Sequence, residues 1–581
     1  MTTPPTPIAS MLPWAHCAQG ADPLTDPIGC RGIPVPGHPT CLAHLTDTDR
    51  DTYLASLTPG ADLDHRGTPF TEDLLDRLLN AVRDPTTTYP CIGNAWFRGA
   101  QFSCVARFDR VQFSGYAVFD GAQFSDTAEF DRAEFSRPAS FSGAQFFRAA
   151  LFSEAQFSSL ARFRGAEFFR HASFYGAQFS GNVWFSGAQF SSDALFHGAQ
   201  FVVASEWGPV VCGGTMVLSG AVFGAPVTLE IAAKQVLCTR TRWQSTATIR
   251  VRHASVDLGH AVLEAPLAIT AHPTPFTIER DTMLDESMLL GSGAVRVVSV
   301  QGVDAAYLVL TDTDLSDCLF SGAFHLDQLR LEGRTTLAFT PTGWHRKGIA
   351  PVHWTRRRTL AEEQHWRAQA AGQPAAPANT PPESRRWRTG PHHFDPARTP
   401  DPDDVAPLYR QLRKAFEDGK NEPGAADFYY GECEMRRHDH TGTPKTERRL
   451  LWAYWLLSGY GLRAGRALGW LGAAMLATIV LLMAFGLPIS SPKQEATGTV
   501  PAGGGTVTFV IDKQDVKNPT GDRFTTKRFD KALNVTLNSV VFRSSGQDLT
   551  TTGTYIEMTS RILEPALLAL AVLAVRGRIK R

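Results

Sequence analysis

Residues 119–141 read FDGAQFSDTAEFDRAEFSRPASF, and this stretch decides the fold. Its phenylalanines are separated by steps that alternate between five and six residues, and a small apolar residue stands two positions before each one, as Ala122 does before Phe124. An amphipathic helix needs apolar spacings of three and four, and a strand needs a spacing of two. The pattern therefore predicts a coil of short flat sides, in which Phe points inward and Ser, Gly, Asp or Arg form the corners.

The same phase continues over a much longer part of the chain. Successive coils would stack at the interstrand spacing of about 4.8 Å and pair their backbone groups with each other. The alternative, a disordered tract rich in Phe, Gly and Ser, would leave the rings in water without a core. The phenylalanines that keep the alternating step, which we take as the repeat core, are Phe97, Phe102, Phe108, Phe113, Phe119, Phe124, Phe130, Phe135, Phe141, Phe146, Phe152, Phe157, Phe163, Phe168, Phe174, Phe179, Phe185, Phe190, Phe196 and Phe201.

Units such as FDGAQF at 119–124 resemble the pentapeptide-repeat family, in the variant whose steps alternate between five and six residues. The resemblance implies a β-solenoid, specifically a right-handed quadrilateral β-helix. With four sides per coil, two repeat units would make one coil of about 22 residues, and the regular array would supply roughly five coils.

The array divides the N-terminal part of the chain into segments. Residues 1–90 are expected to form an N-terminal cap or irregular segment, and residues 91–205 the regular β-helix. Beyond this point the Phe phase decays into stretches rich in Val, Leu and Thr, so residues 206–345 are expected to be a degenerate extension of the solenoid. Residues 346–403 are rich in Pro and Arg and predict a linker, either plainly solvated or adhering to anionic headgroups.

Residues 404–466 are expected to form a juxtamembrane helical hairpin, broken near Asn421, followed by an interfacial helix. The sequence FYYGECEMRR at 428–437, followed by aromatic residues up to 471, resembles the element that precedes the membrane helix in actinobacterial pentapeptide-repeat membrane proteins. This resemblance implies that the solenoid and a membrane module belong to one architecture.

Two segments near the C-terminus predict membrane spans. Residues 467–488 are apolar and long enough to cross, and Arg463 and Arg466 before them place the preceding chain in the cytoplasm. A second helix at 555–576, an extracytoplasmic loop at 489–554 and a basic tail at 577–581 follow. The start of the chain has no signal-peptide pattern, and the scattered cysteines predict no disulfide framework. We therefore expect a two-pass plasma-membrane protein with both termini in the cytoplasm.

The second span carries charges on one helical face, at Glu557, Arg561 and Glu564. They either lie in the headgroup region of a short snorkelling helix or form a polar face against another helix or a water-filled path. A soluble amphipathic helix is a third interpretation. The loop contains ALNVTLNSVVF (532–542), a short amphipathic helix before a polar tract, which is the order found in two-helix channels. No T-V-G-Y-G sequence supports potassium selectivity.

A candidate metal site lies near the N-terminus, with His16 and His38 as spare donors. Three thiolates and an imidazole can form a closed structural zinc site, although the C-x12-C-x10-C-x2-H spacing is not a standard zinc pattern. Buried free cysteines in a cap are the alternative. No motif predicts an active site or another cofactor. The candidate zinc ligands are Cys17, Cys30, Cys41 and His44.

The balance of acidic and basic residues excludes some classes of function. The chain has 57 basic and 57 acidic residues, so we expect no nucleic-acid partner. Residues 94–201 contain nine acidic residues and nine arginines, so their net charge is zero. The DNA-mimicking family members that bind topoisomerases need a strongly acidic surface, so DNA mimicry is only a remote alternative. The leading hypothesis is a non-enzymatic, membrane-anchored scaffold for an unidentified protein partner. A channel-like or transport-accessory protein is the alternative, and the sequence does not set the oligomeric state.

Overall fold

The computed structural model describes residues 14–22, 24–203, 205–278, 282–289, 291, 293–347, 350–374, 383–390, 399–489, 494–498, 502–507, 509–513, 516–518 and 520–579. Parts of the predicted N-terminal segment, linker and basic tail therefore lie outside the described residues. The chain divides into two compact units, and each is described by itself. The first comprises Met1–Pro400 and Gln411–Lys420, and the second Asp401–Arg410 and Asn421–Arg581.

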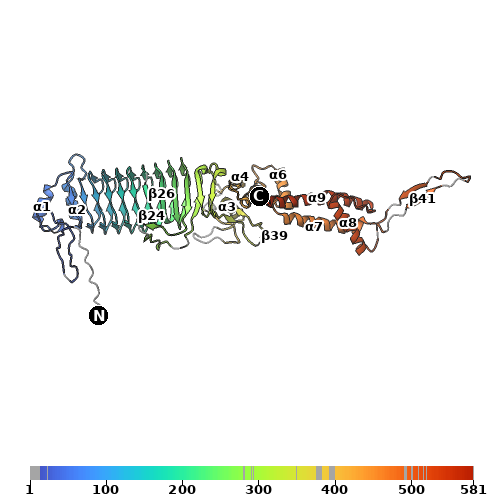
Figure 1. Ribbon diagram of the computed structural model, residues 1–581, viewed down its shortest axis with the longest axis horizontal. Coiled ribbons are helices and arrows are strands. Elements are labelled where there is room, and N and C mark those ends of the chain that lie inside the picture. The colour runs from blue at the N-terminus through green and yellow to red at the C-terminus, as the bar shows by residue number, and fades with distance from the viewer. Residues whose placement is uncertain are drawn as a thin grey trace, which may run out of the picture. The chain divides into compact units, whose positions relative to one another are not determined.

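The first unit is a parallel β-solenoid, as the phenylalanine spacing predicts, with about 11 turns between residues 91 and 332 (Figure 1). Each strand of the regular array pairs in parallel with the strand one coil later. Ala128 pairs with Ala150, and Phe113 with Phe135, so one coil has 22 residues and four sides. The predicted coil length is confirmed.

The strands of the regular array form four faces. Face one holds β4 (Ala95–Trp96), β8 (Ala117–Val118), β12 (Ala139–Ser140), β16 (Ala161–Arg162) and β20 (Val183–Trp184). Face two holds β5 (Gln101–Phe102), β9 (Gln123–Phe124), β13 (Gln145–Phe146), β17 (Glu167–Phe168) and β21 (Gln189–Phe190). Face three holds β6 (Ala106–Arg107), β10 (Ala128–Glu129), β14 (Ala150–Leu151), β18 (Ala172–Ser173) and β22 (Ala194–Leu195). Face four holds β3 (Cys91–Ile92), β7 (Gln112–Phe113), β11 (Glu134–Phe135), β15 (Gln156–Phe157), β19 (Gln178–Phe179), β23 (Gln200–Phe201), β25 (Val222–Phe223), β27 (Arg242–Trp243) and β30 (Val262–Leu263).

The repeat-core phenylalanines form the interior of these coils, and all of them are buried. Rings one coil apart stack almost in parallel, as Phe113 and Phe135 do with centroids 4.8 Å apart and an interplanar angle of 1°. Rings on opposite sides of the coil meet edge to face, as Phe130 and Phe141 do at 5.3 Å and 84°. Both arrangements are favourable for the ring quadrupole, so the core is continuous along the array.

The solenoid already begins within the segment predicted as an N-terminal cap. The strands β1 (Leu63–Asp64) and β2 (Pro69–Phe70) pair in parallel with β4 and β5. Between and around them lie α1 (Asp47–Ser56) and α2 (Glu72–Ala81), and Thr71 caps α2 by accepting a hydrogen bond from the Leu74 amide. The leucines of α2 are buried, so this helix belongs to the closed end of the solenoid.

The predicted extension after residue 205 is a continuous solenoid with shorter coils. Phe223 pairs with Trp243, and their rings stack 4.3 Å apart, so the coil there has 20 residues. The long strands β24 (Ser205–Val217) and β26 (Val227–Leu237) pair along their whole length, and β24 continues three faces of the array. The later strands are β28 (Ala247–Arg252), β29 (Ser255–Asp257), β31 (Leu267–Ala271), β34 (Arg296–Ser299), β35 (Leu308–Thr311) and β36 (Arg330–Glu332).

A packed cap follows the last coils. In α3 (Ala361–Ala370) the Glu362 side chain is fully buried and accepts hydrogen bonds from the amides of Phe320 and Ser321. This helix lies within 346–403, where the sequence predicts a linker; its position reflects buried hydrogen bonds between residues far apart in sequence. Three short antiparallel pairings lie in the described extension and cap: β32 (Thr277–Ile278) with β33 (Thr282–Met283), β37 (Ala338–Phe339) with β40 (Arg358–Thr359), and β38 (Trp344–Lys347) with β39 (Ala350–His353). Near the N-terminus, Asp22 and Asp26 form an isolated antiparallel bridge.

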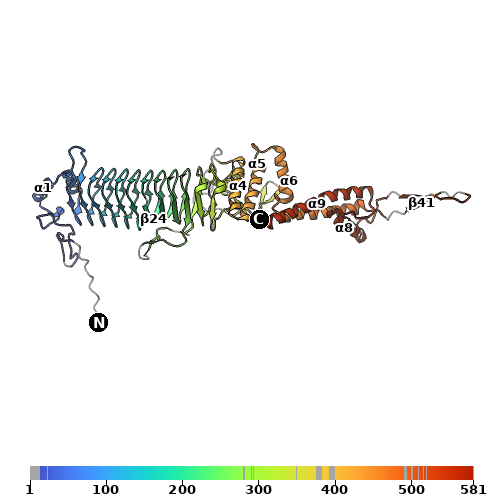
Figure 2. The same cartoon turned by 45° about the horizontal axis from the view of Figure 1, so that its top comes forward.

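The second unit is helical. The helices α4 (Pro402–Asp418), whose last residues belong to the first unit, and α5 (Glu422–His438) form the predicted pair, and Asn421 caps α5. They are followed by α6 (Lys445–Ser458), α7 (Ala464–Leu481) with a π-helical turn at Leu482–Gly486, the hairpin β41 (Gln494–Gly498) and β42 (Phe509–Lys513), α8 (Thr526–Val540) and α9 (Thr551–Ile579). Figure 2 shows α8 and α9 together. Ala464–Gly486 and Thr551–Arg576 are long and apolar enough to cross a membrane.

Candidate functional site

The corner between faces two and three of the array carries an exposed aromatic pair, just before face three resumes at β14 and β18. Phe147 and Phe169 stand at the same corner of successive coils, one residue after a repeat-core phenylalanine, and their rings stack 4.9 Å apart at 3°. They are 41% and 40% exposed, in contrast with the buried rings beside them. Each is the second residue of a Phe-Phe dipeptide in the sequence, and the repeat period by itself does not mark it.

The apolar surface extends across face three. Leu151 and Leu195 point outward from β14 and β22, which both pair with β18 between them. At the next corner the exposed rings of Tyr175 and His197 stack 5.6 Å apart. The face-three patch is therefore defined by Phe147, Leu151, Phe169, Tyr175, Leu195 and His197. The exposed side chains of Arg148 and Arg170 follow its two phenylalanines.

The charged face predicted on the second span meets other parts of the second unit. Glu564 is fully buried and accepts a hydrogen bond of 2.9 Å from the Thr478 hydroxyl on α7. Glu557 pairs with Arg561 at 2.7 Å and accepts from the Ser545 hydroxyl at 3.2 Å. Glu564 is thus turned toward α7, and Glu557 toward the segment before α9.

The loop helix α8 packs at the end of α7 and the beginning of α9. Ala532 and Val535 of α8 share an apolar cluster with Leu482 and Met483, and Ile556 of α9 packs against it. Arg528 donates to the carbonyl oxygens of Met483, Leu487 and Pro488 at 2.8–2.9 Å. These carbonyls lie in and just after the last helical turn, Leu482–Gly486, so Arg528 fixes α8 at this helix end.

The four predicted zinc ligands come together in the first unit. One ligand atom from each of Cys17, Cys30, Cys41 and His44 lies within 4.8 Å of the others, and this Cys3His cluster could hold a metal ion. The predicted spare donors His16 and His38 are not part of it. Burial raises the pKa of the Cys41 thiol, and the neighbouring Cys30 and Cys17 add to this rise because thiolates repel each other.

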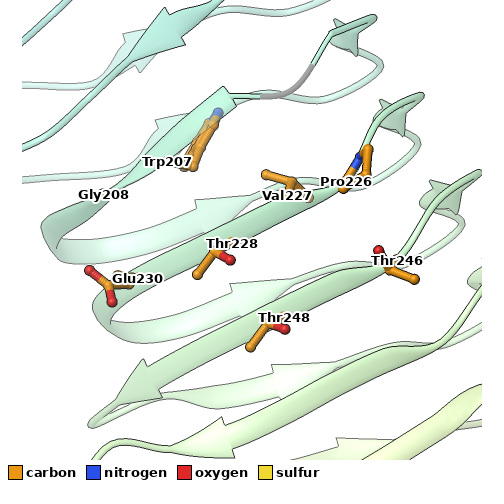
Figure 3. Close-up of a pocket in the computed structure, with 8 residues that line it drawn as sticks. All are labelled: Trp207, Gly208, Pro226, Val227, Thr228, Glu230, Thr246 and Thr248. Carbon is orange, nitrogen blue, oxygen red and sulfur yellow. The ribbon is translucent and has the colours of Figure 1, made fainter.

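The outer surface of the extension also has a pocket of about 520 Å³ (Figure 3). Trp207, Thr228, Glu230 and Thr248 line it, from the adjacent strands β24, β26 and β28. The Glu230 carboxylate is paired with Arg250 at 2.9 Å. This lining combines hydroxyls with one neutralised carboxylate and holds no pair of groups arranged for acid–base or nucleophilic catalysis.

The comparisons with known proteins address the array. The family model "Pentapeptide repeats (9 copies)" matches residues 91–134, 130–178 and 152–200. No curated protein and no solved structure matches the chain. The matched ranges coincide with the coils in which strands recur every 22 residues. Residues 91–200 are therefore an array of pentapeptide repeats.

Proposed function

We propose that this chain is a membrane-anchored, non-enzymatic pentapeptide-repeat scaffold that holds a protein partner on the face-three patch. The observation that carries the proposal is an exposed, ordered apolar patch on a rigid array, in the same chain as two helices of membrane-spanning length. Pentapeptide-repeat solenoids are typically structural or interaction scaffolds.

The patch has the chemistry of a protein-binding surface. Aromatic residues are enriched at the buried centres of interfaces because they bury a large area while losing little side-chain entropy. The stacking of Phe147 on Phe169 holds both rings in one orientation before any partner arrives. Arg148 and Arg170 beside them favour a partner whose apolar contact surface is bordered by acidic residues.

The membrane anchor is the second part of the proposal. The first candidate span has 23 residues, which at 1.5 Å per residue is about 35 Å of helix and enough to cross the hydrocarbon core. Large apolar side chains such as Leu476 on α7 and Leu573 on α9 are exposed, as lipid-facing residues would be. Arg463 just before α7 and Arg466 in its first turn support a cytoplasmic location for the solenoid.

Fractionation with protease mapping tests the anchor. We expect the full chain in the membrane fraction to resist carbonate extraction, and a tag after residue 581 to be protected from external protease in intact cells. A tag inserted in the 502–507 segment should be cleaved. Release of the chain by carbonate would overturn the anchor.

Site-specific photo-crosslinking in cells tests the patch. A photoreactive residue at Phe147 should crosslink one protein reproducibly, and the same residue at Gln156 on face four serves as the control. Phe169→Ser should abolish the crosslink, whereas Gln178→Ser on face four should leave it. Equal crosslinking from both faces, or none from position 147, would contradict the proposed docking surface.

A channel-like function is the second candidate, favoured by one observation. The helix α8 is held between the facing ends of α7 and α9, which is the order of elements in two-helix channels. Purified full-length protein in planar bilayers would show discrete conductance steps that Arg528→Ala alters, since this variant releases α8. A bilayer that stays silent at all applied potentials would count against conduction.

A further inference from the structure

We propose that the Cys3His cluster binds one Zn²⁺ in a closed tetrahedral site, and that this ion fastens the N-terminal segment to the first coils of the solenoid. This inference is independent of the proposed scaffold function. It concerns the stability of the solenoid's N-terminal end rather than what its faces bind.

Three of the six distances between the ligand atoms match the edges of a zinc tetrahedron. Zinc lies about 2.3 Å from thiolate sulfur and about 2.0–2.1 Å from imidazole nitrogen, so two sulfurs should be about 3.8 Å apart and a sulfur and a nitrogen about 3.6 Å. Sγ of Cys30 and Sγ of Cys41 are 3.6 Å apart. Nδ1 of His44 lies 3.5 Å from Sγ of Cys17 and 3.4 Å from Sγ of Cys41.

Two local structures bring the ligands to one point. The backbones of Cys17 and Cys30 are aligned by paired hydrogen bonds, from the Cys17 amide to the Gly32 carbonyl and from the Cys30 amide to the Gln19 carbonyl. Cys41 and His44 face the same side because they begin and end a 3₁₀ turn, in which the His44 amide donates to the Cys41 carbonyl at 2.9 Å. One ligand pair thus comes from each structure.

Gly32 lies against two of the cysteine side chains in the cluster. Its amide donates to Sγ of Cys30 at 3.4 Å, the kind of contact that orients a metal ligand and stabilises thiolate charge. A Cβ at this position would lie 2.7 Å from Cβ and 2.8 Å from Sγ of Cys41. A glycine is therefore required for the Cys41 sulfur to reach the cluster.

The segment around the cluster is poor in other stabilising structure. Across residues 14–22 and 24–45, the structure describes one isolated bridge and one 3₁₀ turn besides several hydrogen-bonded turns, and the buried apolar residues are Val35, Cys41, Leu42 and Leu45. Segments with so small a core commonly depend on a metal or a disulfide. The Ile33 amide donates to the Arg66 carbonyl at 2.8 Å, so a fixed cluster would hold this segment on the first coil.

The alternative explanation for the close cysteines is a disulfide bond between two of them. A disulfide needs two sulfurs about 2.05 Å apart and would leave the third thiol and the imidazole without a role. Four ligand atoms gathered within 4.8 Å of one another, three of them sulfur, instead fit zinc, since thiolate-rich sites favour this ion. The proposal therefore requires reduced cysteines.

Metal analysis of the purified full-length protein tests the proposal. We expect about one zinc per chain after gel filtration, and all nine cysteines to react with a thiol reagent after chelation under denaturing conditions. Exchange with Co²⁺ should give the visible absorption of a tetrahedral thiolate site. Protein without stoichiometric metal, or with a Cys30–Cys41 disulfide in mass spectrometry, would overturn it.

Variants separate a metal site from mere packing. His44→Ala removes an exposed ligand and should abolish zinc retention, and His44→Cys should restore it because cysteine is also a zinc ligand. His38→Ala and Cys104→Ser, outside the cluster, should retain full zinc. Chelation should increase hydrogen exchange in residues 14–45 of the wild type and leave residues 119–141 unchanged. Loss of zinc in the control variants, or no change on chelation, would contradict the proposal.

Discussion

His65 occupies the inward position in the first coil that Phe97 occupies one coil later. The register shows this directly, since Leu63 pairs with Ala95 and Asp64 with Trp96 in the two residues before them. The two ring centroids are 6.1 Å apart, and His65 is fully buried against Phe70 and Tyr53. An imidazole therefore replaces phenylalanine at the start of the aromatic column.

This substitution predicts a pH dependence of stability. Burial lowers the pKa of His65 to about 4. Because the unfolded chain takes up this proton near its ordinary pKa of about 6.5, stability is lost as the pH falls from about 6.5 to about 4, by roughly 3 kcal/mol in all. His65→Phe should remove this loss, measured by hydrogen exchange of residues 63–97 at several pH values. The exposed His171→Phe should not, and an unchanged pH profile in His65→Phe would refute the assignment.

Truncating an inward-pointing side chain of the array should lower stability far more than truncating an outward-pointing one. Phe135→Ala removes a ring that stacks between Phe113 and Phe157. We expect a loss of about 3–5 kcal/mol, as for buried Phe in other cores. Glu134→Ala, one residue earlier and pointing outward, should change stability by no more than about 0.5 kcal/mol. Denaturant unfolding followed by circular dichroism compares them, and equal effects would contradict the inward assignment.

Glu362 should protect the C-terminal end of the solenoid. Glu362→Ala leaves the buried amides of Phe320 and Ser321 without their acceptor, at a cost of about 1–3 kcal/mol. Hydrogen exchange at these two amides should accelerate. The exposed Glu332→Ala serves as the control and should leave their exchange unchanged; protection that survives in Glu362→Ala would show that another group caps the coil.

The close approach of Gly553 to Gly486 should not tolerate a side chain. A Cβ on Gly553 would lie 2.3 Å from the Gly486 carbonyl oxygen, so the backbone would have to move. Gly553→Ala should lower stability in detergent by about 1–3 kcal/mol. Gly472→Ala, on α7 with no atom within 4 Å of the added methyl group, should be neutral or stabilising. Comparable melting temperatures for the two variants would refute the contact.

The hydrogen bond between Thr478 and Glu564 should couple α7 to α9. Thr478→Val is expected to cost about 1 kcal/mol in the wild type and clearly less in a Glu564→Leu background, because the partner is then gone. Unfolding in mixed micelles measures this double-mutant cycle. Thr559→Val, whose hydroxyl bonds within α9, provides the comparison, and additive effects at 478 and 564 would contradict a direct interaction.

The Phe array was predictable to the level of individual side chains because its information is local. The alternating step of five and six residues predicts which residues point inward, and the four sides implied by the resemblance to pentapeptide repeats add the coil length of about 22 residues. A short amphipathic helix at 532–542 was also predicted, and α8 covers most of it but begins earlier, at Thr526. The four candidate zinc ligands could be named from their residue types, but the sequence could not predict the distances between them.

Other features depend on contacts between distant residues. The cap formed by α3 looks like a linker in the sequence, because Glu362 and Glu363 are charged and become buried only where Arg357 and the amides at 320 and 321 satisfy them. The sequence likewise does not show which groups the charged residues at 557, 561 and 564 contact. The structure shows the Thr478 hydroxyl beside Glu564. Polar residues carry no local signal that distinguishes solvation from a buried partner.

The sequence by itself determined the repeat period, the buried column of phenylalanines and the two apolar helices, since each is a periodic or continuous pattern of hydrophobic burial. Only the tertiary structure decided that histidine begins the column, that Phe147 and Phe169 align into an exposed patch, and that four metal-binding side chains converge. Hydrophobic periodicity acts along the chain, whereas these sites arise where coils and turns place distant side chains at specific distances.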